Sequence, residues 1–177
     1  MNESIARLNT EGLDIVGRGV ATPSDPSGAR SRQRTSVYAD PLSWLVLDAV
    51  RHAIDGHSEE LLSSREFVGH VVVSDHCTTH TMRGIAATLA AGRISPLRFS
   101  GANPGSVCSL PSQFLGFSGP SMTLSMPPAR GLPPALAICR AWLREGSATH
   151  MLLTSHDADA SGHRVTTTVL RETRKGD

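Results

Sequence analysis

The chain has 177 residues, a formal net charge of +1, 39% hydrophobic residues and 4% aromatic residues. This length allows one well-buried domain, so we predict a single domain over residues 1–177. Balanced charge without basic runs argues against a nucleic-acid partner, and the absence of any run of about 20 apolar residues argues against a membrane partner. Because the N-terminus does not resemble a leader, we expect a cytoplasmic protein.

The first part of the chain predicts a strand, a loop and a helix. Residues 12–23 alternate well enough for a strand, and their glycines permit close approach of a neighbouring backbone. Residues 22–39 lack periodicity and are predicted to form a flexible loop. Its arginines, Arg30, Arg32 and Arg34, either contact an acidic carrier protein or simply lie in solvent. Asp40 followed by Pro41 is typical of a helix start, and the helical pattern ends at Gly56.

The middle of the chain alternates between strand and helix signals. Residues 67–74 include the run Val71–Val73, which is typical of a strand covered on both faces and favours a parallel sheet. An amphipathic helix is predicted from Thr79 to Ala91. Asn103 before Pro104 repeats the helix-start signal, and Pro111 must shorten or kink the helix that follows.

The last third predicts a strand over 121–126, an elbow, a helix ending near Glu145, and strands over 148–155 and 163–170. Because Pro133 and Pro134 fit only in a first turn, the helix is expected to begin near Arg130 or Gly131. The short link between the last two strands requires antiparallel pairing, and the polar tail over 171–177 is expected to fray. The order β-α-β-α-α-β-α-β-β predicts an α/β fold with a mostly parallel sheet.

The elbow carries a family resemblance. The sequence from Gly119 to Leu132, GPSMTLSMPPARGL, resembles the nucleophile region of β-ketoacyl synthases of the thiolase superfamily, whose pattern is close to G-P-x-x-x-V-x-T-A-C-x-S-G-L. Alignment on Gly131 and Leu132 puts Pro128 at the position of the catalytic cysteine. Proline has neither a thiol nor an N–H group, so it can neither attack a thioester nor stabilise an oxyanion through its backbone.

The resemblance covers roughly residues 12–170, and residues 12–23 and 94–120 contribute to it. It implies the N-terminal half of a thiolase fold: a three-layer α/β domain with a five-stranded, mostly parallel mixed sheet, its last strand antiparallel, and helices on both faces. In the family, the second half supplies two histidines to the condensing site. We therefore expect no condensing activity from this chain alone.

One functional interpretation is a partner subunit. Ketosynthase-like subunits without the cysteine, the chain-length factors of polyketide synthesis, pair with an active ketosynthase. The resemblance implies that the helix after the elbow is sandwiched in the complete fold and that strand 121–126 lies beside a dimer axis. Because that helix is apolar at Leu132 and over 135–139, its surface requires a covering chain. The expected pseudoenzyme would bind a ketosynthase, a second copy of itself or an acyl carrier protein, whose phosphopantetheine presents the substrate.

The alternative is a stand-alone isomerase or dehydratase acting on carrier-bound acyl chains through the loop Asp75-His76-Cys77-Thr78-Thr79-His80, called the 75–80 loop below. The loop follows a buried strand, at the edge where open α/β sheets place ligands. Asp75, His76 and Cys77 are the candidate catalytic residues, with the thiol as a nucleophile or an imidazole as a base. A polar loop around a buried thiol is the simpler interpretation.

The candidate substrate-binding residues come from four places in the sequence: His80, Asn103, Arg130 and His156. Arg130, just after the elbow, suits a phosphate or carboxylate at a helix N-terminus. His76 and His80 have the spacing of a two-histidine metal site, but no third ligand is evident, so we predict no metal and no resident cofactor. Cys77, Cys108 and Cys139 are odd in number and are expected to be reduced.

Overall fold

The computed structural model describes residues 10–23, 39–89, 92, 96–160 and 162–173. The predicted loop over 22–39, with its three arginines, lies mostly outside these residues, as do residues 174–177 of the predicted tail. The described chain forms one five-stranded sheet in the order β1-β5-β4-β2-β3. The strands are β1 (Leu13–Ala21), β2 (Val68–Val73), β3 (Ser121–Leu124), β4 (His150–Asp159) and β5 (Gly162–Glu172).

The predicted mixed sheet is confirmed, but its "mostly parallel" character needs correction. Strand β2 pairs in parallel with β3 and β4, whereas β5 pairs antiparallel with both β1 and β4. Four strands therefore run one way and β5 runs the other. Because β5 lies inside the sheet and not at its edge, it forms two ladders, and these antiparallel ladders are the longest in the sheet. The short link after β4 makes the antiparallel hairpin that the sequence predicted.

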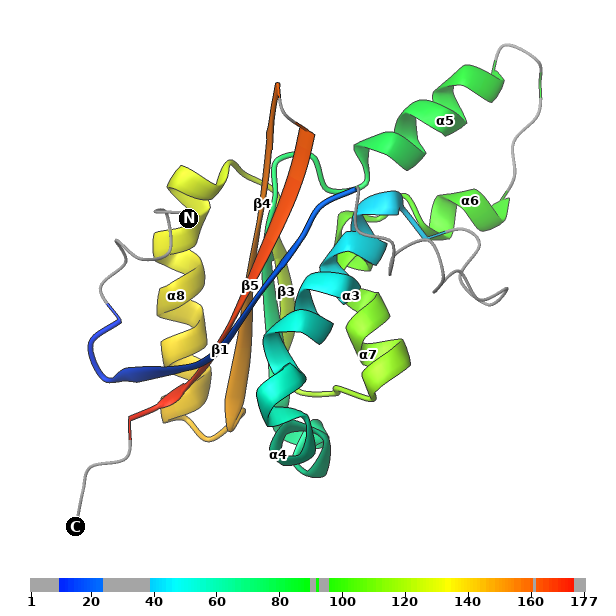
Figure 1. Ribbon diagram of the computed structural model, residues 1–177. Helices are drawn as coiled ribbons and strands as arrows, with labels where there is room; N and C mark the ends of the chain where they lie inside the picture. Colours follow the sequence, from blue (N-terminus) through cyan, green and yellow to red (C-terminus); the bar gives the residue numbers. More distant parts are fainter. Residues whose placement is uncertain (1–9, 24–38, 90–91, 93–95, 161, 174–177) are drawn as a thin grey trace.

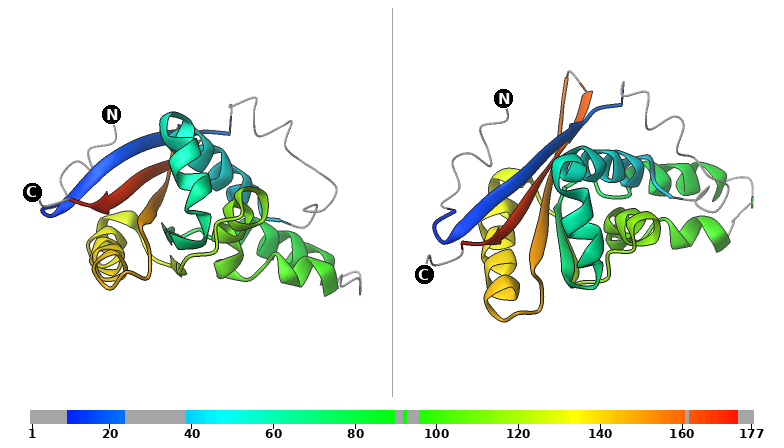
Figure 2. Two further views of the ribbon diagram at one scale, coloured as in Figure 1. Left: turned by 90° about the horizontal axis from the view of Figure 1, so that it is seen from below. Right: turned by 60° about the horizontal axis from the view of Figure 1, so that its bottom comes forward.

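Helices cover both faces of the sheet, as expected (Figure 1). Helix α3 (Pro41–Ile54) and helix α7 (Ser109–Leu115) lie on one face, and helix α8 (Pro128–Arg144) is the only described helix on the other (Figure 2). A separate hydrophobic cluster fills each interface, one around Val46, Val72 and Leu152 and the other around Val71, Leu132 and Leu153. The described chain thus has three layers.

The remaining helical elements are short, apart from α5. They are η2 (Asp55–His57), α4 (Ser58–Ser63), η3 (Arg65–Phe67), α5 (Thr79–Leu89), α6 (Pro96–Ser100) and η4 (Pro104–Cys108). Helices α5 and α6 project away from the sheet beyond α3 and α7 (Figures 1 and 2). Among the described residues, no helix combines the length and apolarity needed to cross a membrane.

Two predicted helix starts are confirmed by their capping bonds. Asp40 Oδ1 accepts a hydrogen bond from the Leu42 N–H at 2.9 Å, which caps α3. Asn103 Oδ1 accepts from the Gly105 N–H at 2.9 Å and caps η4, a 3₁₀ turn that precedes α7. The start predicted for α8 was wrong: the helix begins at Pro128, so Pro133 and Pro134 lie beyond its first turn. Each proline there removes one helical N–H donor.

Glycines bring α3 and the elbow against the sheet, as predicted for the first strand. A Cβ atom on Gly19 would lie 2.2 Å from the backbone oxygen of Ala49 in α3. A Cβ atom on Gly131 in α8 would lie 2.4 Å from Val73 Cγ1 in β2. Both distances are shorter than atomic contact permits, so these positions set how closely the layers approach.

Candidate functional site

Strand alternation places a row of polar side chains on the α3 face of the sheet. Residues at alternate positions share a face, so His70 in β2 and Ser74 just after it point the same way as Thr154 and His156 in β4. His70 Nε2 lies 2.9 Å from Thr154 Oγ1, and Ser74 Oγ lies 2.8 Å from His156 Nδ1. The row runs from the middle of the sheet towards the carboxyl ends of β2 and β4.

His163 joins this row from the neighbouring strand. Because His156 pairs with Val165 in the β4–β5 ladder, His163 is its diagonal neighbour on the same face. His156 Nε2 lies 2.9 Å from His163 Nδ1, and the two rings are stacked with centroids 5.2 Å apart. His156 is fully buried, and burial lowers its pKa to about 4, so the imidazole is neutral near pH 7.

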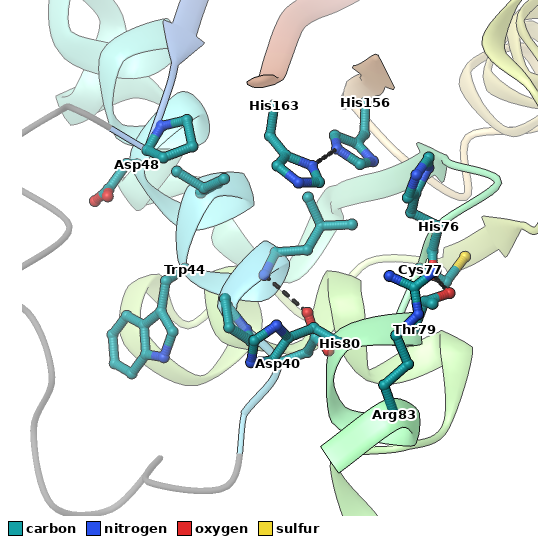
Figure 3. Close-up of a pocket in the computed structure, with 14 residues that line it drawn as sticks. Asp40, Trp44, Asp48, His76, Cys77, Thr79, His80, Arg83, His156 and His163 are labelled. Atoms are coloured by element: carbon teal, nitrogen blue, oxygen red, sulfur yellow. Dashed lines mark hydrogen bonds between the residues drawn. The ribbon is translucent and has the colours of Figure 1, made fainter. Parts of the chain in front are cut away.

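The third imidazole comes from the 75–80 loop. The ring of His76 stands edge-on to the other two, with centroids 5.3 Å from His156 and 5.8 Å from His163. His76 Nδ1 lies 2.8 Å from Asp75 Oδ1. The hydrogen bond from His76 lowers the pKa of the Asp75 carboxyl group, which holds Asp75 as a carboxylate. We call His76, His156 and His163 the histidine cluster (Figure 3).

Cys77 occupies a tight turn directly after His76. Its backbone has φ 41°, in the left-handed region that few residues other than glycine adopt. The thiol donates to the Ser74 carbonyl oxygen at 3.0 Å and lies 3.4 Å from Ser125 Oγ in the elbow. Burial raises the pKa of the thiol, so it is protonated near neutral pH. Its catalytic role stays a prediction, because neither contact is with a base.

The histidine cluster borders a cavity of about 380 Å³ between α3 and α5 (Figure 3). Asp40 ties these two helices together at the cavity, because Oδ1 accepts from the Leu42 N–H in α3 and Oδ2 accepts from the Thr81 N–H in α5, each at 2.9 Å. The lining combines apolar and polar side chains. The lining comprises Pro23, Asp40, Pro41, Leu42, Trp44, Leu45, Asp48, His76, Cys77, Thr79, His80, Arg83, His156 and His163.

The structure brings five of the seven predicted site residues to one place. His76, Cys77, His80 and His156 line the cavity, and Asp75 is bonded to His76. Two others lie elsewhere: the side chain of Asn103 caps η4, and Arg130 is exposed at the start of α8, on the opposite face of the sheet.

Neither His163 nor the second bond of Asp40 was predicted from the sequence. Alternation gave a usable signal for His163, because it stands two residues before Val165, the ladder partner of His156. The Asp40–Thr81 contact joins residues 41 positions apart and had no local signal. In the part of the chain that the structure describes, no group of three or more His, Cys, Asp or Glu residues has the arrangement of a metal site.

The elbow between β3 and α8 contains no thiol. Pro128 is the first residue of α8 and is buried, and the carbonyl oxygen of Pro127 accepts the N–H groups of Arg130 and Gly131 at 2.9 Å. Cys139, further along α8, is fully buried in the core, and burial raises its pKa to about 12. A reactive thiolate is therefore missing from the described part of α8.

The described residues have a thiolase-like fold, which solved ketosynthase and chain-length-factor structures share. The ishigamide ketosynthase/chain length factor matches this chain with a TM-score of 0.75 at 14% identity, covering 94% of this chain and 63% of that one. The type II ketosynthase AntDE, in complex with the acyl-carrier protein AntF, matches with a TM-score of 0.69 at 17% identity, covering 90% and 62%.

A third match is the ketosynthase ApeO in complex with its chain length factor ApeC from Xenorhabdus doucetiae, with a TM-score of 0.66 at 15% identity, covering 93% of this chain and 80% of that one. This chain therefore spans about three-fifths of the first two proteins. No protein-family model matches the sequence, and no curated protein sequence matches it. At these identities, the likeness is one of fold.

Proposed function

We propose that this chain is a non-condensing, ketosynthase-like subunit of polyketide or fatty-acyl biosynthesis that acts as the partner of a ketosynthase or of an acyl carrier protein. The observation that carries the proposal is Pro128 at the start of α8, where the sequence resemblance to the N-terminal half of ketosynthases implies a cysteine. A buried proline supplies no nucleophile and no N–H group at that point.

Two exposed apolar surfaces support a protein partner. The first is the α5–α6 arm, in which α5 buries only Ile85 and α6 buries no residue. Four of its apolar side chains are about half exposed: Met82, Leu89, Leu97 and Phe99. Large apolar side chains gathered on a projecting element are typical of an interface and unfavourable in water.

The second surface is the outer side of α8. Leu132, Leu136 and Leu143 point onto the sheet, whereas the exposed positions are mainly small and apolar. The exposed positions are Ala129, Arg130, Pro133, Pro134, Ala137, Ala141 and Arg144. Between Arg130 and Arg144, every exposed position of α8 is uncharged, and this stretch suits burial against another polypeptide. The structures of ketosynthases bound to a chain length factor or a carrier protein indicate which classes of partner to test.

The test mixes this chain with a ketosynthase and a carrier protein of the same biosynthetic system and measures complex mass by light scattering. The masses of the carrier-bound acyl chains are then followed with and without this chain. We expect a stable complex and products that change only when it forms. Leu97→Asp combined with Phe99→Asp should abolish association, whereas Leu62→Asp, on the similarly exposed Leu62 of α4, should not. A monomer that leaves all products unchanged would refute the proposal.

The histidine cluster favours a second candidate function, proton transfer on an acyl chain. An Asp–His pair with a free ring nitrogen at a cavity is an arrangement suited to a general base. This function corresponds to an isomerase or dehydratase working through the 75–80 loop. Its test uses the chain alone, so it separates cleanly from the partner function.

A further inference from the structure

The hydrogen bonds around Ser74 determine where its hydroxyl proton lies. Ser74 Oγ accepts the N–H groups of His76 and Cys77 at 3.2 and 2.9 Å. A hydroxyl oxygen has two acceptor sites and one proton, so both acceptor sites are occupied. The hydroxyl proton must therefore be donated to His156 Nδ1, 2.8 Å away.

This donation fixes the tautomers of two imidazoles. His156 Nδ1 is an acceptor, so the neutral ring carries its proton on Nε2 and donates it to His163 Nδ1 at 2.9 Å. His163 Nδ1 is then also an acceptor. In its neutral form, His163 carries its proton on Nε2, the ring nitrogen left available to the cavity that His163 lines.

His76 has the opposite tautomer. A carboxylate can only accept, so Asp75 requires the proton of His76 on Nδ1, and the lone pair lies on Nε2. His76 therefore offers a base, and His163 offers an N–H donor, from rings whose centroids are 5.8 Å apart. A base beside a neutral hydrogen-bond donor is a pairing found where a carbonyl compound is enolised.

We propose that His76 and His163 form a catalytic pair that shifts a double bond in a β,γ-unsaturated acyl thioester by moving one proton from C2 to C4. This inference rests on the second candidate function above and not on the partner role. It assigns a catalytic residue, His163, and two positioning residues, Ser74 and His156.

The proposed step needs no oxidant, reductant or co-reactant. His76 Nε2 takes a proton from C2, and the C–H electron pair moves into the carbonyl to form a dienolate, whose oxygen accepts the hydrogen bond of His163 Nε2–H. The carbonyl then re-forms, C2 and C3 become doubly bonded, and the former C3–C4 π pair takes the proton back from His76 at C4. The product is the conjugated α,β-unsaturated thioester, and both imidazoles return to their first state.

The cavity suits such a substrate. Pro41, Leu42 and Leu45 of α3 supply apolar lining for a hydrocarbon chain. Its volume of about 380 Å³ lies within the range of small-molecule sites. The other charged or titratable groups of its lining are Asp40, Asp48, Cys77, His80 and Arg83. Both oxygens of Asp40 already accept backbone N–H groups, which leaves His76 as the better-placed base.

The experiment incubates the full chain with a short β,γ-unsaturated acyl thioester of N-acetylcysteamine in D₂O, with EDTA present, and follows C2, C4 and the double bond by NMR. We expect deuterium at C2 and C4 and conversion to the conjugated isomer. His76→Asn should slow the reaction roughly 10²–10⁴-fold, as for loss of a general base. His163→Phe should slow it roughly 10²–10³-fold, as for loss of one oxyanion donor.

His57→Asn is the matched control, because His57 is an exposed imidazole in η2. It should react like the wild type. If the C2 and C4 protons of the substrate exchange no faster with the folded wild-type chain than in buffer alone, the proposal is overturned. So would a reaction that persists in His76→Asn, or one that requires added zinc. A failed complex with the ketosynthase would leave it standing.

A second measurement tests the roles of the positioning residues without any substrate. Long-range ¹⁵N–¹H spectra of the histidine rings should show His163 and His156 protonated on Nε2 and His76 protonated on Nδ1. Ser74→Ala should shift His156 and His163 towards a mixture of tautomers and lower the isomerisation rate. If the wild-type spectrum shows His163 protonated on Nδ1, the assignment of the donor is wrong, whether or not Ser74→Ala folds.

Discussion

Asp40 is the residue whose replacement tests the architecture of the site most directly. Its carboxylate is almost fully buried and accepts one N–H group from α3 and one from α5. Asp40→Ala removes both acceptors. Loss of an N-cap costs about 1 kcal/mol, and a poorly solvated donor left without a partner costs about 1–3 kcal/mol. We therefore expect the free energy of unfolding to fall by roughly 2–4 kcal/mol and Tm by roughly 5–15 °C.

Asp40→Asn separates the two contributions. Its amide oxygen preserves the cap on Leu42, since Asn and Asp are equally good N-caps, but its NH₂ group faces the Thr81 N–H and cannot accept from it. Urea unfolding should place Asn between wild type and Ala, and hydrogen exchange should show faster opening confined to the first turn of α5. If Asp40→Asn matches the wild type in both measurements, the bond from Asp40 to Thr81 contributes nothing to stability and the prediction is wrong.

Three further predictions concern protons, packing and thiols. Burial lowers the pKa of His70 to about 3 and that of His156 to about 4, so the unfolded state binds more protons than the folded state below pH 6.5. The free energy of unfolding should therefore be at its full value above pH 6.5 and fall as the pH drops towards 4. His156→Gln should make this fall with pH, measured by urea unfolding, less steep. Gly131→Ala should lower the free energy of unfolding by about 1–3 kcal/mol, because the new methyl group meets Val73. A Tm equal to that of the wild type would contradict this. Cys139 should resist iodoacetamide at pH 8 until urea unfolds the chain. If Cys139 is labelled as fast in the folded protein as in the unfolded chain, its burial in the core is wrong.

Much of the fold was predictable because its signals are local. The cap at Asp40, the β-branched run Val71–Val73 and the short link between β4 and β5 each specify a nearby backbone conformation, and each prediction is confirmed. The position of β5 inside the sheet is different. No local pattern shows that β1 pairs with the edge of β5 that faces away from β4. The share of antiparallel pairing was underestimated for that reason.

The candidate site was only half predictable for the same reason. Its loop was identified because Asp75 to His80 follow a buried strand. The partner of that loop, His163, depends on the register of the β4–β5 ladder, since a slip of one residue would turn the side chain to the other face. The start of α8 was misplaced because we applied the preference for proline in a first turn to Pro133 and Pro134, whereas the helix starts with Pro128 and contains all three.

The two proposed functions share structural elements and can therefore influence each other. Helix α5 supplies Thr79, His80 and Arg83 to the cavity wall and also carries the exposed Met82 and Leu89 of the α5–α6 arm. A partner bound to the arm would contact the same helix that closes the cavity. If partner binding holds α5 in place, adding a ketosynthase should raise the isomerisation rate of the wild type but not that of the Leu97→Asp, Phe99→Asp variant. Equal rates with and without the ketosynthase, once complex formation is verified by light scattering, would show that the arm and the histidine cluster work independently.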